Sequence, residues 1–171
     1  MVETQGPRDV AEIESYLSQL AFIGEYRIKV VTVTPGAVIV ELPFDDRFSG
    51  PPGQFPASMV GTIGDVAAVS SCLSLLPSGW GVATIDFTIK MTGVSKGERL
   101  RAKGRVLQNG RSISVGAADV YIVSGNDESL CGTVLASTRN FEIGRRRLGG
   151  EASAERDPNK TAGLPNTGEE T

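Results

Sequence analysis

A twenty-residue segment with almost no charge constrains the fold of this chain most strongly. Residues 57–76 lie between Pro56 and Pro77, and the only charged side chain among them is Asp65. Proline is tolerated at the start of a helix and ends one, so this segment is predicted to be a long helix. Because a helix that is apolar on all sides is buried, we expect the rest of the chain to surround residues 57–76.

Small side chains cover much of this predicted helix. They are Ala57, Ser58, Gly61, Gly64, Ala67, Ala68, Ser70 and Ser71. Each glycine costs helix stability, roughly 1 kcal/mol relative to alanine. That cost is understandable if another backbone must pack closely against the helix, and we expect such a contact here.

The segments around this helix show strand and helix patterns. Residues 9–20 have the spacing of an amphipathic helix, with a capping box at Asp9 and Glu12. The predicted strands are residues 26–34, 36–44, 82–91, 99–108, 112–123 and 130–141, and residues 45–56 are a predicted loop. Apolar and basic residues alternate in 99–106, which indicates a half-buried strand with a basic outer face. The element order predicts an α+β fold, an antiparallel sheet wrapped around one long central helix.

Net charge, hydrophobicity and cysteine content narrow the class of protein. A net charge of -3 argues against a general nucleic-acid binder. No apolar run approaches the ~20 residues of a membrane span, and no secretion signal is recognisable at the N-terminus. Cys72 and Cys131 fit no metal spacing, so we expect buried, reduced thiols in a cytoplasmic protein. Residues 144–171 contain no aromatic residue and are expected to form a disordered tail.

The chain contains no histidine. This excludes Ser-His-Asp and Cys-His nucleophilic systems. A conventional zinc site is also not expected, because two distant cysteines cannot supply the missing ligands. Any catalysis must rest on carboxylates, hydroxyls, backbone amides or oriented water. Neither a metal nor a cofactor is predicted.

Asp65 is the strongest candidate for chemistry. A lone carboxylate in a buried helix costs several kcal/mol unless it is paired, solvated by a pocket, or protonated. Such a cost is often kept for function. The alternative is a structural carboxylate bonded to backbone or serine groups, and the residues alone leave both interpretations open.

An ordered set of short motifs in residues 53–141 resembles the hotdog-fold acyl-CoA thioesterases of the phenylacetyl-CoA (PaaI-like) type. The family shows Asn-x-x-Gly-x-x-His-Gly-Gly, followed by an acidic residue seven positions later in an apolar helix. The positions that fit are Gly53, Asp65, Thr84-Ile85-Asp86, Gly97-Glu98-Arg99-Leu100, Gly110-Arg111 and the strand ending at Phe141. The match covers about half of the chain. It implies a hotdog thioesterase domain in residues 25–143, after an N-terminal helix in 1–24 and before the tail in 144–171.

The chain departs from this pattern at two places. Gly50 stands where the family has asparagine, and Pro56-Ala57-Ser58 stands where it has His-Gly-Gly. In the family a backbone N–H of the glycine pair polarises the thioester carbonyl. A backbone donor survives substitution, so Ala57 or Ser58 can still supply it. Glycine cannot replace the side chain of the asparagine.

The resemblance assigns roles to the remaining site residues. Asp65 is the general base or the nucleophile, and Thr84 orients water or the carboxylate of a neighbouring subunit. Gly110, Arg111 and Ser112 bind the CoA phosphates and pantetheine, and Gly53 belongs to the substrate-binding set. From the residues alone, the interpretation of Thr84 as an ordinary strand residue is favoured, and Gly110–Ser112 is equally a hairpin turn with a solvated arginine.

Two functions from different classes follow. The first is an acyl-CoA thioesterase for an aryl or medium-chain acyl group. The second is a catalytically silent hotdog protein that binds acyl-CoA or serves as an assembly partner, which the changes at Gly50 and Pro56 favour. A hotdog dehydratase is poorly supported, because those enzymes use a histidine. A homo-oligomer is expected in either case, with a dimer of dimers favoured over a dimer, because a single curled sheet leaves its edges open.

Overall fold

The computed structural model describes residues 8–143 and contains one six-stranded antiparallel sheet around a long helix. The elements are α1 (Val10–Leu17), α2 (Ala21–Glu25), β1 (Lys29–Thr34), β2 (Ala37–Pro43), η1 (Asp46–Phe48), α3 (Ala57–Leu73), β3 (Trp80–Met91), β4 (Arg99–Asn109), β5 (Ile113–Ser124) and β6 (Asp127–Glu142). The strand order is β1-β2-β4-β5-β6-β3. The predicted α+β architecture is confirmed. The tail predicted for residues 144–171 lies outside the described part of the chain.

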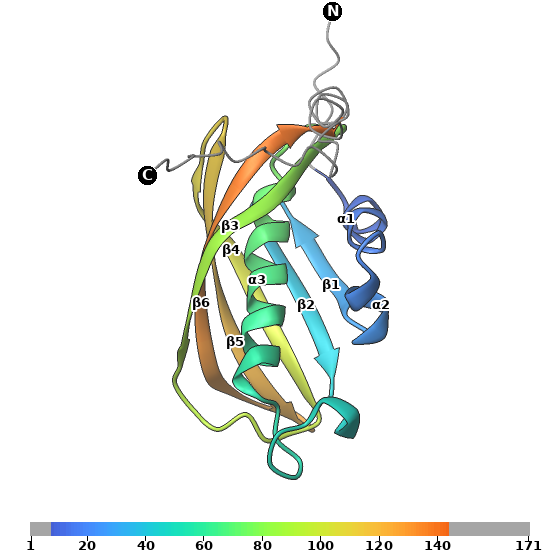
Figure 1. The fold of residues 1–171 in the computed structure, drawn as a ribbon, viewed down its shortest axis with the longest axis vertical. Coiled ribbons are helices and arrows are strands. Elements are labelled where there is room, and N and C mark those ends of the chain that lie inside the picture. Colours follow the sequence, from blue (N-terminus) through green and yellow to red (C-terminus); the bar gives the residue numbers. More distant parts are fainter. Residues whose placement is uncertain (1–7, 144–171) are drawn as a thin grey trace, which may run out of the picture.

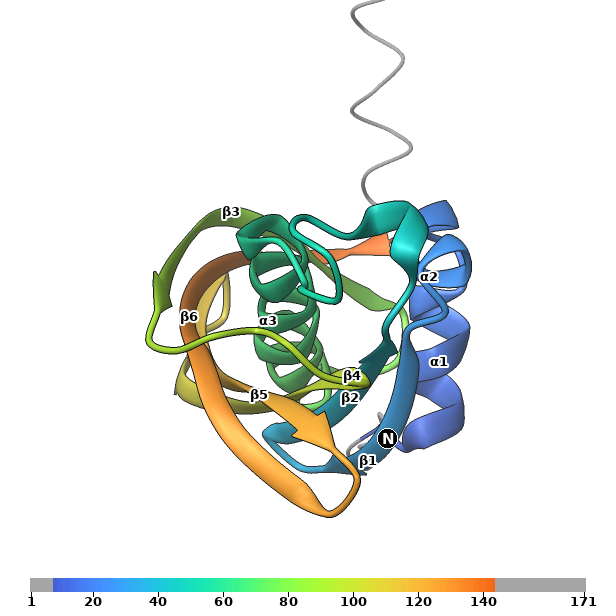
Figure 2. The same cartoon turned by 90° about the horizontal axis from the view of Figure 1, so that it is seen from below.

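Helix α3 is the centre of the molecule. The sheet curves around it in both views, with α1 and α2 beside the β1 edge (Figures 1 and 2). Most of its side chains are buried, as the sequence predicts. Pro56 is the N-cap, and the helix ends at Leu73, three residues earlier than expected, where Ser74 forms the C-cap. Residues 74–76 continue as a hydrogen-bonded turn before Pro77.

The expected close approach of another backbone to α3 is present, and glycines of the sheet make it. A Cβ added to Gly116 would lie 2.6 Å from the carbonyl oxygen of Ala68, and one added to Gly104 would clash with the carbonyl oxygen of Ala67. On the helix, a side chain at Gly64 would clash with Val134. Gly104 and Gly116 therefore let β4 and β5 lie against α3, and Gly64 leaves room for a side chain of β6.

This contact predicts a large effect of one methyl group. Gly104→Ala should lower the free energy of unfolding by about 3 kcal/mol, because the new Cβ meets helix backbone that cannot move aside easily. Gly24→Ala is the matched control, since nothing lies near that position and alanine favours the helix. Urea denaturation of both variants measures the difference. Equal midpoints would contradict the close packing.

The N-terminal region contains two helices where one was predicted. The capping box is confirmed, with Asp9 Oδ1 accepting from the N–H of Glu12 and the Glu12 carboxylate accepting from the N–H of Asp9. However, α1 ends at Leu17, because Leu20 is extended and interrupts the helix before α2 begins. Buried side chains of α1 and α2 belong to the same hydrophobic core as α3.

The basic face of β4 is also as predicted, and its charges are paired. Leu100 and Ala102 are fully buried, while the basic side chains contact acidic groups of the neighbouring strands. The ion pairs are Arg99–Glu41, Arg101–Glu41, Arg101–Glu128, Lys103–Glu128 and Arg105–Asp119. These cations therefore stabilise the outer face of the sheet and are not arranged to receive phosphate groups.

Within residues 8–143, no helix has both the length and the apolar character needed to cross a bilayer.

Candidate active site

Asp65 lies half-buried on α3, and its carboxylate is hydrogen-bonded to the edge strand β3. The hydroxyl of Thr84 donates to the carboxylate, with its Oγ1 3.2 Å from each oxygen of Asp65. The backbone explains this contact. Beside Thr84 the pairing of β3 with β6 is irregular, since Thr84 pairs with Thr138 and Asp86 with Ser137, leaving Ile85 as an extra residue. This irregularity sets which side chains of β3 face α3.

The pKa of Asp65 is raised to about 6. Burial among apolar side chains is the main cause, since it disfavours the charged form, and the hydrogen bond from Thr84 opposes the shift. A carboxylate with this pKa is ionised at pH 7 yet basic enough to remove a proton from water. The structure thus gives Asp65 the electrostatic properties of a general base.

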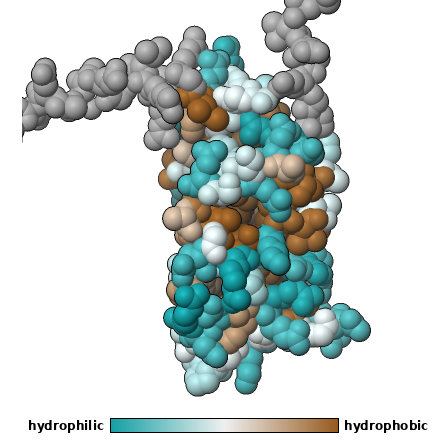
Figure 3. Space-filling view, turned by 90° about the vertical axis from the view of Figure 1, so that its right-hand side faces the viewer, coloured by the Kyte–Doolittle hydropathy of each residue, from teal (hydrophilic) through white to brown (hydrophobic). Residues whose placement is uncertain are grey.

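An apolar pocket opens beside Asp65, with a volume of about 600 Å³. It lies between α3, the N-terminal helices, β3 and the end of β6. Its lining residues are Tyr16, Leu17, Gln19, Leu20, Phe22, Asp65, Val66, Val69, Ser70, Leu73, Val82, Ala83, Thr84, Phe141 and Ile143. Such a volume is typical of small-molecule sites. The face of the molecule on the side of α1 and α2 shows apolar patches among polar side chains (Figure 3).

The resemblance gave Thr84 the role of orienting water or the carboxylate of a neighbouring subunit, and the structure shows a contact within one chain. Thr84 and Asp65 are hydrogen-bonded within one chain. The two residues therefore form one unit within the chain.

The expected oxyanion donors are distant from Asp65. Ala57 and Ser58 are exposed in the first turn of α3, where the N–H groups of Met59 and Val60 donate to the Pro56 carbonyl. The earlier N–H groups of a helix have no partner within it. Ala57 precedes Asp65 by eight residues, which corresponds to ~12 Å along the helix. One chain alone does not bring these groups together with Asp65.

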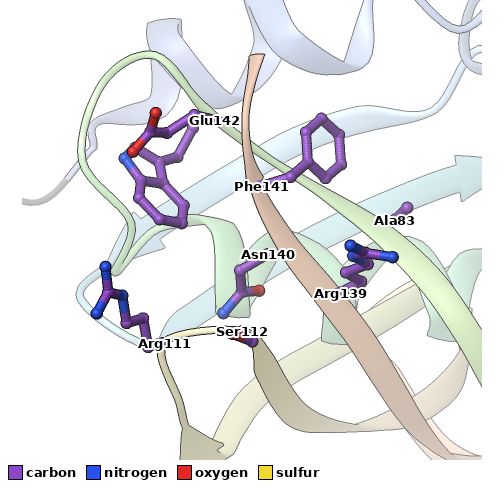
Figure 4. A pocket seen from close by; sticks show the side chains of 8 residues that line it. Ala83, Arg111, Ser112, Arg139, Asn140, Phe141 and Glu142 are labelled. Atoms are coloured by element: carbon purple, nitrogen blue, oxygen red, sulfur yellow. The ribbon is translucent and has the colours of Figure 1, made fainter. Parts of the chain in front are cut away.

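Arg111 and Ser112 line a second cavity, of about 650 Å³, at the start of β3 and the end of β6. Its other lining residues are Trp80, Ala83, Arg139, Asn140, Phe141 and Glu142 (Figure 4). The side chain of Asn140 donates to the carbonyl oxygen of Gly110 at 2.7 Å and so ties the β4–β5 hairpin to β6. Ala83 and Phe141 also line the pocket beside Asp65, so the two cavities share these walls.

Several lining residues were not recognised in the sequence. Arg139 lies in a strand that alternates like any other, and Trp80 precedes the predicted strand, so neither carries a distinguishing pattern. The wall formed by α1 and α2 was missed because amphipathic spacing shows that a helix is half-buried and does not show what it covers.

Gly53 was expected among the substrate-binding residues, but it lines neither cavity. It lies in the loop after η1 with a φ of 75°, and a Cβ there would approach Lys96. Its place is consistent with a turn that requires glycine. No cluster of three or more potential metal ligands is present between residues 8 and 143.

The sequence matches no protein-family model and no curated protein. The fold, in contrast, is similar to solved structures. A thioesterase family protein from Silicibacter pomeroyi is 22% identical with a TM-score of 0.73, over 77% of this chain and 96% of that one. A thioesterase from Haemophilus influenzae is 15% identical with a TM-score of 0.70, over 84% and 96%.

A third similar structure is a putative thioesterase from Ralstonia eutropha described as phenylacetic acid degradation-related. It is 19% identical with a TM-score of 0.64, over 74% of this chain and 98% of that one. At these identities the comparison concerns the fold. The chain has the hotdog fold of these thioesterase structures, which confirms the fold that the resemblance in the sequence implied.

Proposed function

We propose that this protein is a cytoplasmic acyl-CoA thioesterase that acts as a homo-oligomer and hydrolyses an aryl or medium-chain acyl-CoA. One observation carries the proposal, namely a half-buried carboxylate with a pKa raised to about 6, at the end of an apolar pocket. The similar folds named as thioesterases support the same reaction class.

Asp65 performs one of two roles in this reaction. As general base, its carboxylate takes a proton from water while the water oxygen bonds to the acyl carbon. The tetrahedral oxyanion then collapses, and the thiolate of CoA leaves and is protonated. As nucleophile, the carboxylate itself attacks, expels CoA thiolate and forms an anhydride that water hydrolyses. Thr84 holds the carboxylate in place for either role.

A second subunit supplies the oxyanion donor in this proposal. The donor must lie about 3 Å from the reacting oxygen, whereas Ala57 lies ~12 Å along α3 from Asp65 of the same chain. When the two-fold axis is perpendicular to α3, the α3 helices of the two copies are antiparallel, so the start of one α3 can lie beside Asp65 of the other. The Ala57 or Ser58 N–H of the partner would then polarise the carbonyl.

Strand β3 is the surface on which the two copies would meet. It is an edge strand of the sheet, and Ile85 and Phe87 are 56% and 43% exposed there. An exposed apolar edge is a template for another strand. Pairing two copies of β3 would cover it and join the sheets. Further association of two dimers gives the tetramer that we favour.

Arg111 and Ser112 are proposed to bind the CoA portion from the cavity that they line, and Gly110 from a smaller cavity that it shares with Arg111. Arginine suits this role because its guanidinium can bind phosphate oxygens in pairs. The hydrogen bond from Asn140 to Gly110 fixes the hairpin that carries Arg111.

A second candidate function is supported by the changed loop before α3. Gly50 lies where the family has asparagine, and its N–H donates to the carbonyl of Gln54, so the position offers no side chain to substrate. A protein that binds acyl-CoA without hydrolysing it is consistent with this. Release of CoA thiol from a panel of acyl-CoAs separates the two functions. Binding without thiol release would favour the silent protein.

The pH dependence of hydrolysis follows from the pKa of Asp65. Because the ionised form is the reactive one, the rate should fall about tenfold per pH unit below 6 and be constant above pH 7. Thr84→Val should move the midpoint to higher pH, because the hydroxyl stabilises the ionised carboxylate. Rates of thiol release between pH 4.5 and 8.5 measure both effects. A flat wild-type profile would contradict the role of Asp65.

A further inference from the structure

The pocket beside Asp65 follows α3 for a defined length. The residues that α3 contributes to it are Asp65, Val66, Val69, Ser70 and Leu73, which share one face of the helix. Asp65 and Leu73 are eight residues apart, or ~12 Å along the axis. Leu73 is almost completely buried. The pocket therefore runs about two helical turns from the carboxylate, as far as the buried Leu73.

The outer wall of the pocket comes from the N-terminal helices. Tyr16, Leu17, Gln19, Leu20 and Phe22 line it opposite α3. Leu20 and Ile143 are 41% and 46% exposed, although both are large apolar residues. Exposed apolar side chains around a concave surface are typical of a ligand site.

Polar contacts fix this wall to the rest of the fold. The hydroxyl of Tyr16 donates to the carbonyl of Val82 at 2.9 Å and accepts from its N–H at 3.1 Å, which ties α1 to β3. Before α1, the buried guanidinium of Arg8 donates to three carbonyls that follow α3, those of Leu76, Pro77 and Trp80. The wall is thus held in place against β3 and the segment that follows α3.

We propose that α1 and α2 make this pocket a length-selective site for an unbranched acyl chain of about ten carbons. The acyl carbonyl lies at Asp65 and the chain runs along α3 toward Leu73. An extended chain advances about 1.2 Å per bond, so ~12 Å holds on the order of ten carbons. A phenyl ring reaches only the level of Val69. The inference rests on the proposed function only in placing an acyl carbonyl beside Asp65.

Binding of inert amides tests this directly. Primary amides with three to fourteen unbranched carbons, and phenylacetamide, are titrated into the full-length protein by calorimetry. They carry the acyl carbonyl, no charge and no thioester. Affinity should rise about fourfold per added CH₂ up to about ten carbons and then stop rising. A continuous rise to fourteen carbons, tighter binding of phenylacetamide than of decanamide, or no binding at all would overturn the proposal.

A shortened pocket gives the second test. Val69→Phe places a ring one turn from Asp65, ~6 Å along α3. The chain length at which affinity stops rising should therefore fall to about five carbons. Val31→Phe is the matched control, because Val31 is exposed on β1 and lines no part of the pocket. If Val69→Phe folds and its affinity still rises up to about ten carbons, the acyl chain does not run along α3. If this variant does not fold, the wild-type series decides alone.

The wall is tested separately. Leu20→Ser should weaken decanamide binding several-fold, whereas Leu107→Ser, on β4 and outside the pocket, should not change it. Equal affinities of the two variants would show that α2 and the turn before it do not form the wall. If the amides bind as expected but no thiol is released from acyl-CoAs, this inference stands and the proposed hydrolysis is wrong. If acyl-CoAs are hydrolysed but amide affinity does not level off with chain length, the proposed hydrolysis stands and this inference is wrong.

Discussion

Asp65→Asn should lower the turnover of acyl-CoA by about 10²- to 10⁴-fold, the range by which a positioned base accelerates a reaction. The amide has the size of the carboxylate and can still accept the hydrogen bond of Thr84. It cannot take a proton from water, and it is a poor nucleophile. Binding of CoA should remain, since Arg111 and Ser112 line a different cavity.

The same substitution should stabilise the protein at neutral pH. The pKa of Asp65 is raised from 3.8 to about 6, so the folded state binds this proton more tightly than the unfolded chain does. Ionised Asp65 therefore destabilises the fold above pH 6, by up to about 3 kcal/mol, and this cost disappears as the pH falls toward 4. Asp65→Asn should raise the unfolding midpoint at pH 8 and gain little at pH 4.

A paired control separates these effects from a general loss of charge. Asp127→Asn changes an exposed residue at the start of β6 and should alter neither turnover nor the pH dependence of stability. Thiol release and urea denaturation at pH 4 and pH 8 measure both quantities. Wild-type turnover in Asp65→Asn would remove Asp65 from the reaction.

The fold could be predicted because one segment left few alternatives. A helix without charge, except at Asp65, has to be surrounded, and six predicted strands are enough to do so. The boundaries were less predictable. Residues 124–129 were expected to form a turn, yet β5 and β6 pair as far as Ser124 and Asp127, because Gly125 adopts a φ of 58° and permits a two-residue turn. Polarity alone does not distinguish such a turn from a longer one.

The site was only partly predictable for a geometrical reason. Asp65 was recognisable from its unusual neighbours. The hydrogen bond between Asp65 and Thr84 depends on the irregular pairing at Ile85. This irregularity changes which side chains of β3 face α3, and no sequence pattern predicts it. The wall at Leu20 and Phe22 depends on how two short helices cross α3. These contacts join distant segments, whose relative placement local patterns do not determine.

Mixing two inactive variants should restore about a quarter of the wild-type activity if each site is shared between two subunits. One variant is Asp65→Asn. The other is Ala57→Pro, which removes the N–H at the start of α3 that the site of the partner would use. Proline is compatible with the first helical position, and Pro56 before it is already extended, with ψ 156°. In a random 1:1 mixture half of the two-fold dimers are mixed, and each has one intact site, so about a quarter of all sites recover.

The position of Thr84 provides a control for this experiment that the chain itself supplies. Since Thr84 and Asp65 belong to one chain, no mixed dimer of Asp65→Asn and Thr84→Val contains an intact pair. That mixture should therefore show only the average activity of its two components, while the first mixture exceeds both of its own. Light scattering establishes the assembly, and subunit exchange is verified with differently tagged chains. A fully active monomer would end the proposal of an obligate oligomer, and verified mixed dimers without recovery would show that each chain holds a complete site.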